Sequence, residues 1–324
     1  MLSTDSPART ALGPTPHQPD ALDPSPRNHV PHNHFPRSAA AGLWWGLLGV
    51  VAFSLTVPLT RVAVAGLPPL FVGAGRAAVA GFLALAVLLV TRQPLPTRHQ
   101  WWRLAVVALG IVVGFPFLST LALQTAPASH GAVVGAVLPA VTAVLAVLRG
   151  RERPRLRFWL FSAAGALAVL LFASLRNGGL EGLQAADWLL FGAIAAAAVG
   201  YAEGGLLSRE LGSWQTVSWA LVLSLPVMVL LSGYSVATEP FHADAAQWGS
   251  FTYLAVVSMY LGYFAWYRGL AIGPMTSVSQ VQLVQPVLSI VWAALLLGEA
   301  ITWPTLLGGL TVVLCAGFAV RSRR

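Results

Sequence analysis

The sequence predicts an all-α integral membrane protein with ten transmembrane helices, arranged as two inverted repeats of five helices each. Two observations lead to this fold class: the composition of the chain and an internal duplication. Hydrophobic residues make up 56% of the chain and charged residues only 9%, whereas about a quarter of a soluble domain is charged. A soluble fold cannot bury this much apolar surface, so a lipid environment is indicated.

The duplication is visible as residues that recur with one constant offset. Matching residues lie 147 positions apart (274 − 127): Pro127 and Pro274, Pro139 and Pro286, Glu152 and Glu299, Trp101 and Trp248, Phe117 and Phe264. A duplicated membrane unit is the plan from which many transporters build a binding site between their halves.

Residues 1–40 are expected to be a disordered cytoplasmic tail. The stretch is rich in Pro, Ser, His and Asp and shows no apolar periodicity. It does not resemble a signal peptide, because the first apolar run begins only at Ala41 and exceeds twenty residues. His29, His32 and His34 have a spacing that can hold a metal, but a solvated tail explains them, and no metal site is predicted.

From Ala41 onward the chain is a series of apolar runs, each near the roughly 20 residues needed to cross a bilayer. The first repeat, residues 41–176, and the second repeat, residues 186–320, contain five runs each. The predicted spans are 41–62, 68–91, 101–123, 128–148, 158–175, 186–208, 214–234, 249–271, 275–297 and 301–320.

All nineteen basic residues other than His are Arg, and they gather on one side of the predicted bundle. With the N-terminus in the cytoplasm, the outer connections hold only Arg61 and Arg176, and the other arginines of the connections are internal. Both termini are therefore predicted to be cytoplasmic, in a bacterial cytoplasmic (inner) membrane. Because five crossings is an odd number, the second repeat must enter from the opposite side, which makes the repeats inverted. Arginines placed at the ends of apolar runs serve topology, so nucleic acid is not an expected partner.

Each half continues with a Pro-initiated helix, a central Pro and then a Glu. The second copy reads GPMTSVSQVQLVQPVLSIVWAALLLGEAIT and the first reads APASHGAVVGAVLPAVTAVLAVLRGRERPR. This pattern resembles the paired EamA domains of the drug/metabolite transporter superfamily over about residues 41–320. The first copy departs from the family at RGRE, where an apolar residue usually precedes Gly-Glu. The resemblance implies a ten-helix secondary transporter, commonly an exporter of amino acids or other small metabolites.

The ninth predicted helix carries the most informative polar residues. At about 100° per residue, one face combines Pro286 with four polar side chains: Ser279, Gln282, Gln285 and Ser289. Two Gln amides cannot face lipid without hydrogen-bond partners, so this stripe faces protein or a water-filled cavity. Either it is a wall of the substrate path, or it holds helices together by hydrogen bonds.

The eighth helix places Tyr260, Tyr263 and Tyr267 on one face, and their hydroxyls need partners. Tyr260 and Tyr263 are candidates for lining a cavity that takes aromatic or amphipathic solutes, with core packing as the alternative. On the fourth helix, Gly131 and Gly135 permit either close helix packing or room for a ligand.

Four ionisable residues are candidates for coupling or for binding charge. Glu203 can bind a proton or a cation, or be an interfacial carboxylate that reaches water. Arg76 can hold a substrate carboxylate or brace the backbone. It lies roughly 12 Å from the outer end of the second predicted helix, at 1.5 Å per residue. His130 can titrate near neutral pH or serve as a cap. Glu299 is expected to cap the helix that begins near residue 301.

The sequence therefore predicts alternating-access transport of a small molecule, with lipid as surroundings and protons as candidate coupling ions. No cofactor and no enzymatic activity are expected. An intramembrane enzyme and a non-transporting membrane sensor are the alternatives. The predicted spans contain neither a His-rich nor a paired-Asp arrangement, and no cytoplasmic output domain is expected.

The predicted topology can be tested with reporter fusions. A fusion at residue 324 should report the cytoplasm, and a fusion within residues 177–184 should report the opposite side, because five predicted helices separate them. Identical readings at the two positions would show that the predicted number of helices is wrong.

Overall fold

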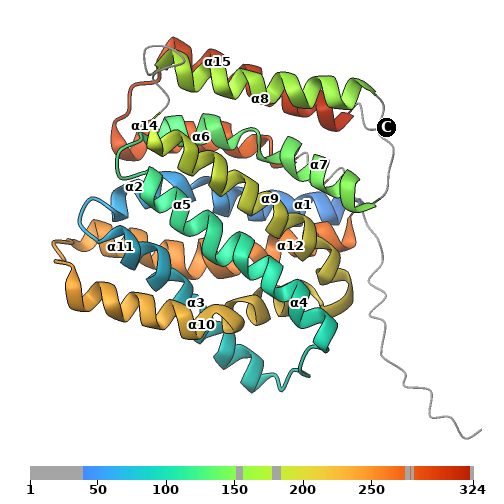
Figure 1. Cartoon of the computed structure of the whole chain (residues 1–324), viewed down its shortest axis with the longest axis vertical. Coiled ribbons are helices and arrows are strands. Elements are labelled where there is room, and N and C mark those ends of the chain that lie inside the picture. The colour runs from blue at the N-terminus through green and yellow to red at the C-terminus, as the bar shows by residue number, and fades with distance from the viewer. Residues whose placement is uncertain (1–38, 151–155, 177–183, 274–277, 279–280, 322–324) are drawn as a thin grey trace, which may run out of the picture. The chain divides into compact units, whose positions relative to one another are not determined.

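The computed structural model describes residues 39–150, 156–176, 184–273, 278 and 281–321, and every regular element in these ranges is a helix (Figure 1). The predicted tail, residues 1–40, falls almost entirely outside the described residues. Five helical stretches are long and apolar enough to cross a membrane: Ala40–Ala63, Pro69–Val90, Arg98–Ala122, Ala185–Leu211 and Ser213–Thr238. The predicted all-α membrane class is confirmed, while the count of ten spans and the inversion of the repeats stay predictions.

The helices of the first half follow the predicted runs but break several of them into shorter pieces. They are α1 (Ala39–Ser54), α2 (Thr56–Ala63), α3 (Pro69–Val90), α4 (Arg98–Val107), η1 (Ala108–Gly114), α5 (Phe115–Ala122), α6 (Ala128–Gly135), α7 (Leu138–Gly150) and α8 (Leu156–Arg176). In the second half they are α9 (Ala185–Leu211), α10 (Ser213–Thr238), α11 (Ala245–Tyr253), η3 (Leu254–Leu261), α12 (Gly262–Ile272), α14 (Val284–Leu297) and α15 (Trp303–Arg321).

Local sequence explains where several helices begin. Before α4, Thr97 accepts a hydrogen bond from the backbone of Gln100, whose side chain accepts one from Thr97 N, and together they form a capping box. Asp244 and Gln247 form the same arrangement before α11. Helix α3 begins at Pro69, in the first turn where the missing N–H of proline costs nothing.

Two segments of π-helix lie at matching places in the two halves. Segment η1 covers Ala108–Gly114 and η3 covers Leu254–Leu261, which is within one residue of the 147-residue offset. A π-helix contains an extra residue per turn and is rare, so its recurrence at the same register supports descent of both halves from one unit. Each divides a long helix that the sequence predicted as one span.

The two central prolines also interrupt their helices in the same way. Helix α6 ends at Gly135 and α7 begins at Leu138, so Pro139 lies in the first turn of α7. Pro286 likewise lies in the first turn of α14, after a turn at Gln282 and Leu283. A proline ring clashes with the carbonyl four residues before it, and a new helix start is the position that tolerates this.

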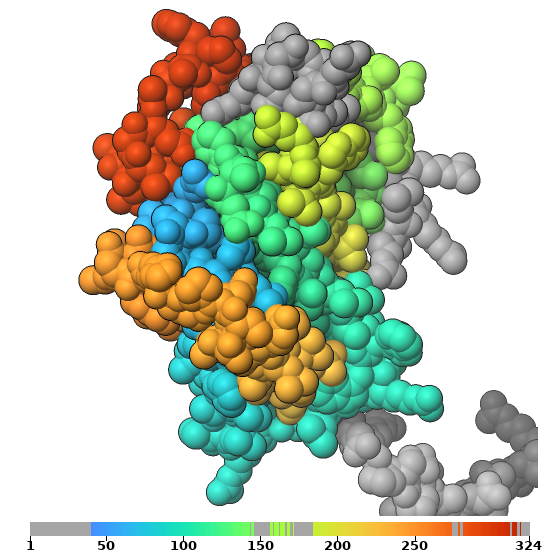
Figure 2. Space-filling view, turned by 60° about the vertical axis from the view of Figure 1, so that its left-hand side comes forward, coloured from blue at the N-terminus to red at the C-terminus, as the bar shows by residue number. Residues whose placement is uncertain are grey.

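The helices pack in pairs that are distant in sequence. Helix α3 packs against α10, α1 against α12, α6 against α14 and α8 against α15. Figure 1 shows α8 and α15 side by side at the top of the view, with α6 and α14 next to them. In Figure 2 the orange segment that includes α10 lies across the surface beside the blue-to-cyan helices of the first half.

Apolar side chains cover much of the outer surface as well as the interior. Leu89, Leu230 and Leu295 are each at least two-thirds exposed, and they lie on three different helices. The interior is filled largely by small residues, with Ala74, Ala77 and other alanines fully buried. Exposed apolar residues on many helices, with small residues inside, are typical of a bundle that lipid surrounds.

Glycines bring α1 and α12 into backbone contact. A Cβ atom added to Gly269 would lie 2.7 Å from Gly46 N and 2.9 Å from Gly42 O, which is too close for the helices to keep their spacing. Small residues at a helix crossing are a common way to obtain van der Waals contact in membranes.

Gly269→Ala should therefore lower thermal stability in detergent, by about 1–3 kcal/mol as is usual for overpacked sites. The matched control is Gly233→Ala in α10, where an added Cβ meets nothing within 4 Å. This control should melt at the original temperature or slightly above it, because Ala favours a helix more than Gly does. Equal melting of both variants would contradict the close α1–α12 crossing.

Candidate functional site

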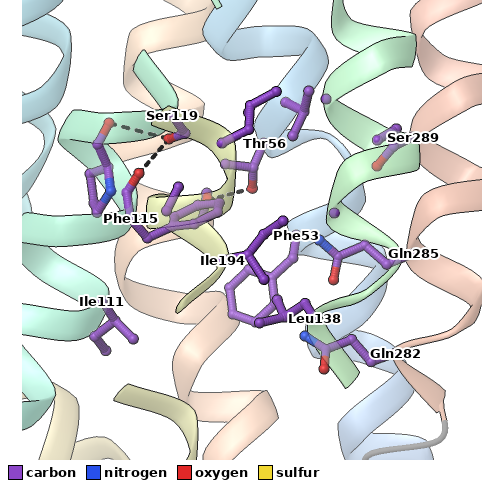
Figure 3. Close-up of a pocket in the computed structure, with 18 of the residues that line it drawn as sticks. Phe53, Thr56, Ile111, Phe115, Ser119, Leu138, Ile194, Gln282, Gln285 and Ser289 are labelled. Carbon is purple, nitrogen blue, oxygen red and sulfur yellow. Dashed lines mark hydrogen bonds between the residues drawn. The ribbon is translucent and has the colours of Figure 1, made fainter. Parts of the chain in front are cut away.

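A cavity lies among helices from both halves of the chain, next to the interruption before α14 (Figure 3). Its volume is about 60 Å³, well below the roughly 300–1,000 Å³ typical of ligand pockets. Apolar side chains form most of the wall, among them Phe53, Ile111, Phe115, Leu138 and Ile194. A solute larger than a few water molecules therefore enters only when the surrounding helices move apart.

The two predicted glutamines point into this cavity. Gln282 and Gln285 extend from the same stretch of chain towards Phe53, Leu138 and Ile194 (Figure 3). Gln282 is only 2% exposed, yet within the described part of the chain neither its amide nitrogen nor its amide oxygen has a hydrogen-bond partner. The amide oxygen of Gln285 also lacks a hydrogen-bond partner among these described residues. Buried amides are almost always hydrogen-bonded in native proteins, so an unbonded one in a cavity wall marks a place for a polar ligand or water.

Gln282 lies in the interruption before α14 and lines the cavity. The residue stands in the turn just before the helix, where its carbonyl accepts a hydrogen bond of 3.0 Å from Gln285 N. Pro286 has no N–H to offer this carbonyl and displaces the chain at this point. Discontinuous helices with this kind of break hold the substrate in several transporter folds.

The other predicted substrate-binding residues are divided between the cavity and its surroundings. Ser289 and Tyr263 line the cavity. Ser289 already donates a hydrogen bond of 2.7 Å to Ser54 O. Tyr260 is buried outside the lining, where its hydroxyl lies 3.1 Å from Ser218 Oγ and its ring packs edge-on against Phe264. Ser279 lies outside the described residues.

Arg76 is the charged residue of this cavity. It projects from α3 and is 1% exposed. Its Nη2 atom contacts Thr120 Oγ1 at 3.5 Å, the outer limit of a hydrogen bond, and its Nε atom has no hydrogen-bond partner in the ranges that the structure describes. No carboxylate among the described residues pairs with Arg76.

Glu203 lies elsewhere, in an ion-pair network between α4 and α9. Its carboxylate accepts a hydrogen bond from Arg103 Nε, and Arg103 Nη1 donates to Glu210. Glu203 is nearly buried, whereas Glu210 is about half exposed. Glu203 does not pair directly with Arg76, and it does not line the cavity.

His130 pairs with a residue that the sequence did not single out. Its Nε2 atom lies 2.6 Å from Asp187 Oδ1, and both side chains are buried. The other oxygen of Asp187 accepts a hydrogen bond from Gln184 N, so Asp187 also caps α9. An acidic residue in the first turn of a predicted helix was the only available signal, and that position alone suggests a cap rather than a partner.

Glu299 caps a different helix from the one expected. Its two carboxylate oxygens accept hydrogen bonds from Ala128 N at 2.8 Å and Ser129 N at 2.9 Å, at the start of α6. The expected cap was the helix that follows in sequence. Free N–H groups at either helix start attract a carboxylate equally, and packing of α14 against α6 decides between them.

One polar contact in the cavity wall was also missed. Thr56 Oγ1 and Ser258 Oγ lie 2.7 Å apart and join α2 to η3. Hydroxyl residues are common in apolar helices, so the sequence held no sign that these two meet.

Among the described residues, no group of three or more His, Cys, Asp or Glu side chains is placed to hold a metal ion.

Comparison with known proteins decides the family. The model of the EamA-like transporter family matches residues 40–174 and again residues 184–321. The chain belongs to the EamA-like transporter family. The family match confirms the resemblance that the sequence suggested, and it identifies the protein as a membrane transporter.

Two relatives of this EamA-like protein are described as transporters. It is 44% identical to the "Uncharacterized transporter YdeK" of Bacillus subtilis (strain 168) over 276 residues, which cover 85% of this chain and 96% of the relative. It is 26% identical to the "Uncharacterized transporter YvbV" of the same organism, over 82% of this chain and 86% of that one. A solved structure described as "Crystal structure of protein" matches this chain with a TM-score of 0.61 and 19% sequence identity. The match covers 89% of this chain and 99% of the other chain, which shows that the two share a fold.

Glu203→Gln tests the ion pair against a coupling role. We expect thermal stability to fall by about 1–3 kcal/mol, because the guanidinium of Arg103 loses a buried charged partner, while the pH dependence of transport stays unchanged. Glu210→Gln, which removes the more exposed partner of the same arginine, should cost less. Loss of uphill transport with intact counterflow in Glu203→Gln would instead assign proton coupling to this residue.

Proposed function

We propose that this EamA-like protein is a secondary transporter that exports small metabolites, amino acids and amphipathic compounds among them, by alternating access. The observation that carries the proposal is the buried Gln282 amide, which has no hydrogen-bond partner among the described residues and lines a cavity beside a broken helix. A polar group of this kind is costly inside a membrane and is retained where it meets a solute.

The proposal includes the architecture and setting predicted from the sequence. Ten transmembrane helices would form two inverted repeats, with both termini in the cytoplasm and the bundle in a bacterial inner membrane. The shared π-helices and the paired proline interruptions support this duplication. Rocking of one half against the other would then expose the cavity alternately to each side.

The two alternatives receive less support from the cavity. An intramembrane enzyme needs a nucleophile with a base in reach, and the described lining residues include no Asp, Glu, His or Cys. A sensor needs a device that reports binding, whereas the family model that matches residues 40–174 and 184–321 describes transporters. Counterflow of radiolabelled solutes in proteoliposomes tests the transporter proposal directly, since neither alternative exchanges solute across a bilayer.

Gln282→Leu should weaken substrate binding about fivefold or more, since a net hydrogen bond contributes roughly 1 kcal/mol. Its thermal stability should stay level or rise, because an unbonded buried amide is replaced by an apolar side chain. Gln285→Leu should behave alike. The measurements are apparent affinity in counterflow and melting temperature in detergent.

Ser289→Ala is the matched contrast on the same face. Its hydroxyl is already bonded to Ser54 O, so this variant should melt earlier and keep the original affinity. If Gln282→Leu and Gln285→Leu also melt earlier and transport with unchanged affinity, the glutamines hold helices together and the binding site lies elsewhere.

A further inference from the structure

Arg76 is a buried positive charge whose balancing negative charge is missing from the described protein. It lies roughly 10 Å from the start of α3, at 1.5 Å per residue, and its side chain lines the cavity. Elsewhere among the described residues, carboxylates do have partners: Glu203 and Glu210 pair with Arg103, and Asp187 contacts His130. For Arg76 the described residues supply a 3.5 Å contact with Thr120 Oγ1 and no carboxylate.

Such a charge cannot be removed by losing a proton, because a guanidinium stays protonated in proteins. A buried charge without a partner is strongly unfavourable, and inside a membrane it marks a functional position. Structural bracing would use the N–H groups of Arg76 on backbone carbonyls, yet no carbonyl among the described residues accepts from it, and its Nε atom has no partner. The balancing anion therefore has to come from a ligand in the cavity.

The rest of the wall defines what else that ligand carries. The described lining residues contain no carboxylate that could pair with an ammonium group. Gln282 and Gln285 offer amide groups for hydrogen bonds, and Phe53, Ile111 and Ile194 offer an apolar surface. The complementary solute has one carboxylate, a neutral hydrogen-bonding group and a small apolar body.

We infer that the cavity selects organic monoanions, such as N-acylated amino acids or 2-oxo acids, through a carboxylate held by Arg76, in preference to free amino acids. This inference rests on the proposed transport function and narrows its substrate class. The planar guanidinium suits a carboxylate because both can align two parallel hydrogen bonds. Gln282 then bonds the acyl amide or the oxo group. Export of such an anion is favoured by an inside-negative membrane potential, so no coupled proton is required.

The ligand test compares three charge classes built on the same side chains. The anionic class contains N-acetyl-L-leucine and 4-methyl-2-oxopentanoate, the zwitterionic class L-leucine, and the cationic class L-leucinamide, with matching alanine and phenylalanine sets. Full-length protein is assayed for thermal stabilisation in detergent and for counterflow in proteoliposomes. We expect the anions to bind at least tenfold more tightly than the other two classes, and an inside-negative potential to accelerate their efflux.

Variants of Arg76 separate binding from bracing. Arg76→Gln should reduce affinity for the anions at least tenfold while the protein melts at the same or a higher temperature, because an unpaired buried charge has been removed. Arg76→Lys should retain part of the affinity. The control Arg98→Gln removes an equal charge from an exposed position and should leave binding unchanged. A bracing role predicts the reverse for Arg76→Gln, namely earlier melting with unaltered affinity, and would overturn the inference.

The ligand classes also distinguish failure of the inference from failure of the proposed function. If zwitterions or cations exchange as well as the anions do, the inference is overturned and the transport function stands. If no class exchanges in counterflow, the proposed function is overturned and the inference falls with it.

Discussion

The rings of Pro139 and Pro286 impose the constraint on which the candidate site depends. Each proline removes one backbone donor and pushes away the carbonyl four residues earlier, so each helix stops and starts again. In a lipid environment such a break is tolerated only where protein or a cavity satisfies the backbone. The break before α14 is therefore buried among other helices, and it turns the amide of Gln282 towards the cavity.

The buried charged side chains described above lie in two different environments. Arg103 forms an ion pair with Glu203 that joins α4 to α9, and His130 contacts the carboxylate of Asp187, which joins α6 to α9. Glu299 joins the two halves by capping α6 from the loop after α14. Arg76 alone faces the cavity without a carboxylate. Because an unpaired charge in a membrane is retained only for a reason, the paired charges are best explained by structure and the unpaired one by function.

Much of the site could be predicted from the sequence because polar residues are rare in apolar helices. The Gln282 and Gln285 stripe was found from its helical spacing, and Arg76 and Tyr263 were found because each is polar within a predicted span; all four line the cavity. The same rule could not distinguish Tyr260 from the residues that line the cavity. Tyr260 is equally polar and lies on the same predicted face, but its hydroxyl bonds to Ser218 outside the cavity. The π-helical turns of η3 change the register of that face, which a wheel of regular spacing cannot represent.

The sequence by itself determined the all-helical membrane class, the duplication and the residues whose burial needs an explanation, because these follow from composition, periodicity and a constant offset. Only the tertiary structure decided which polar groups satisfy one another. Glu299 caps α6 instead of the next helix, Asp187 meets His130, and Thr56 meets Ser258. Each of these contacts joins residues more than fifty positions apart, and a hydrogen bond acts over about 3 Å. Partners are therefore chosen by how helices pack in space, which the local sequence does not encode.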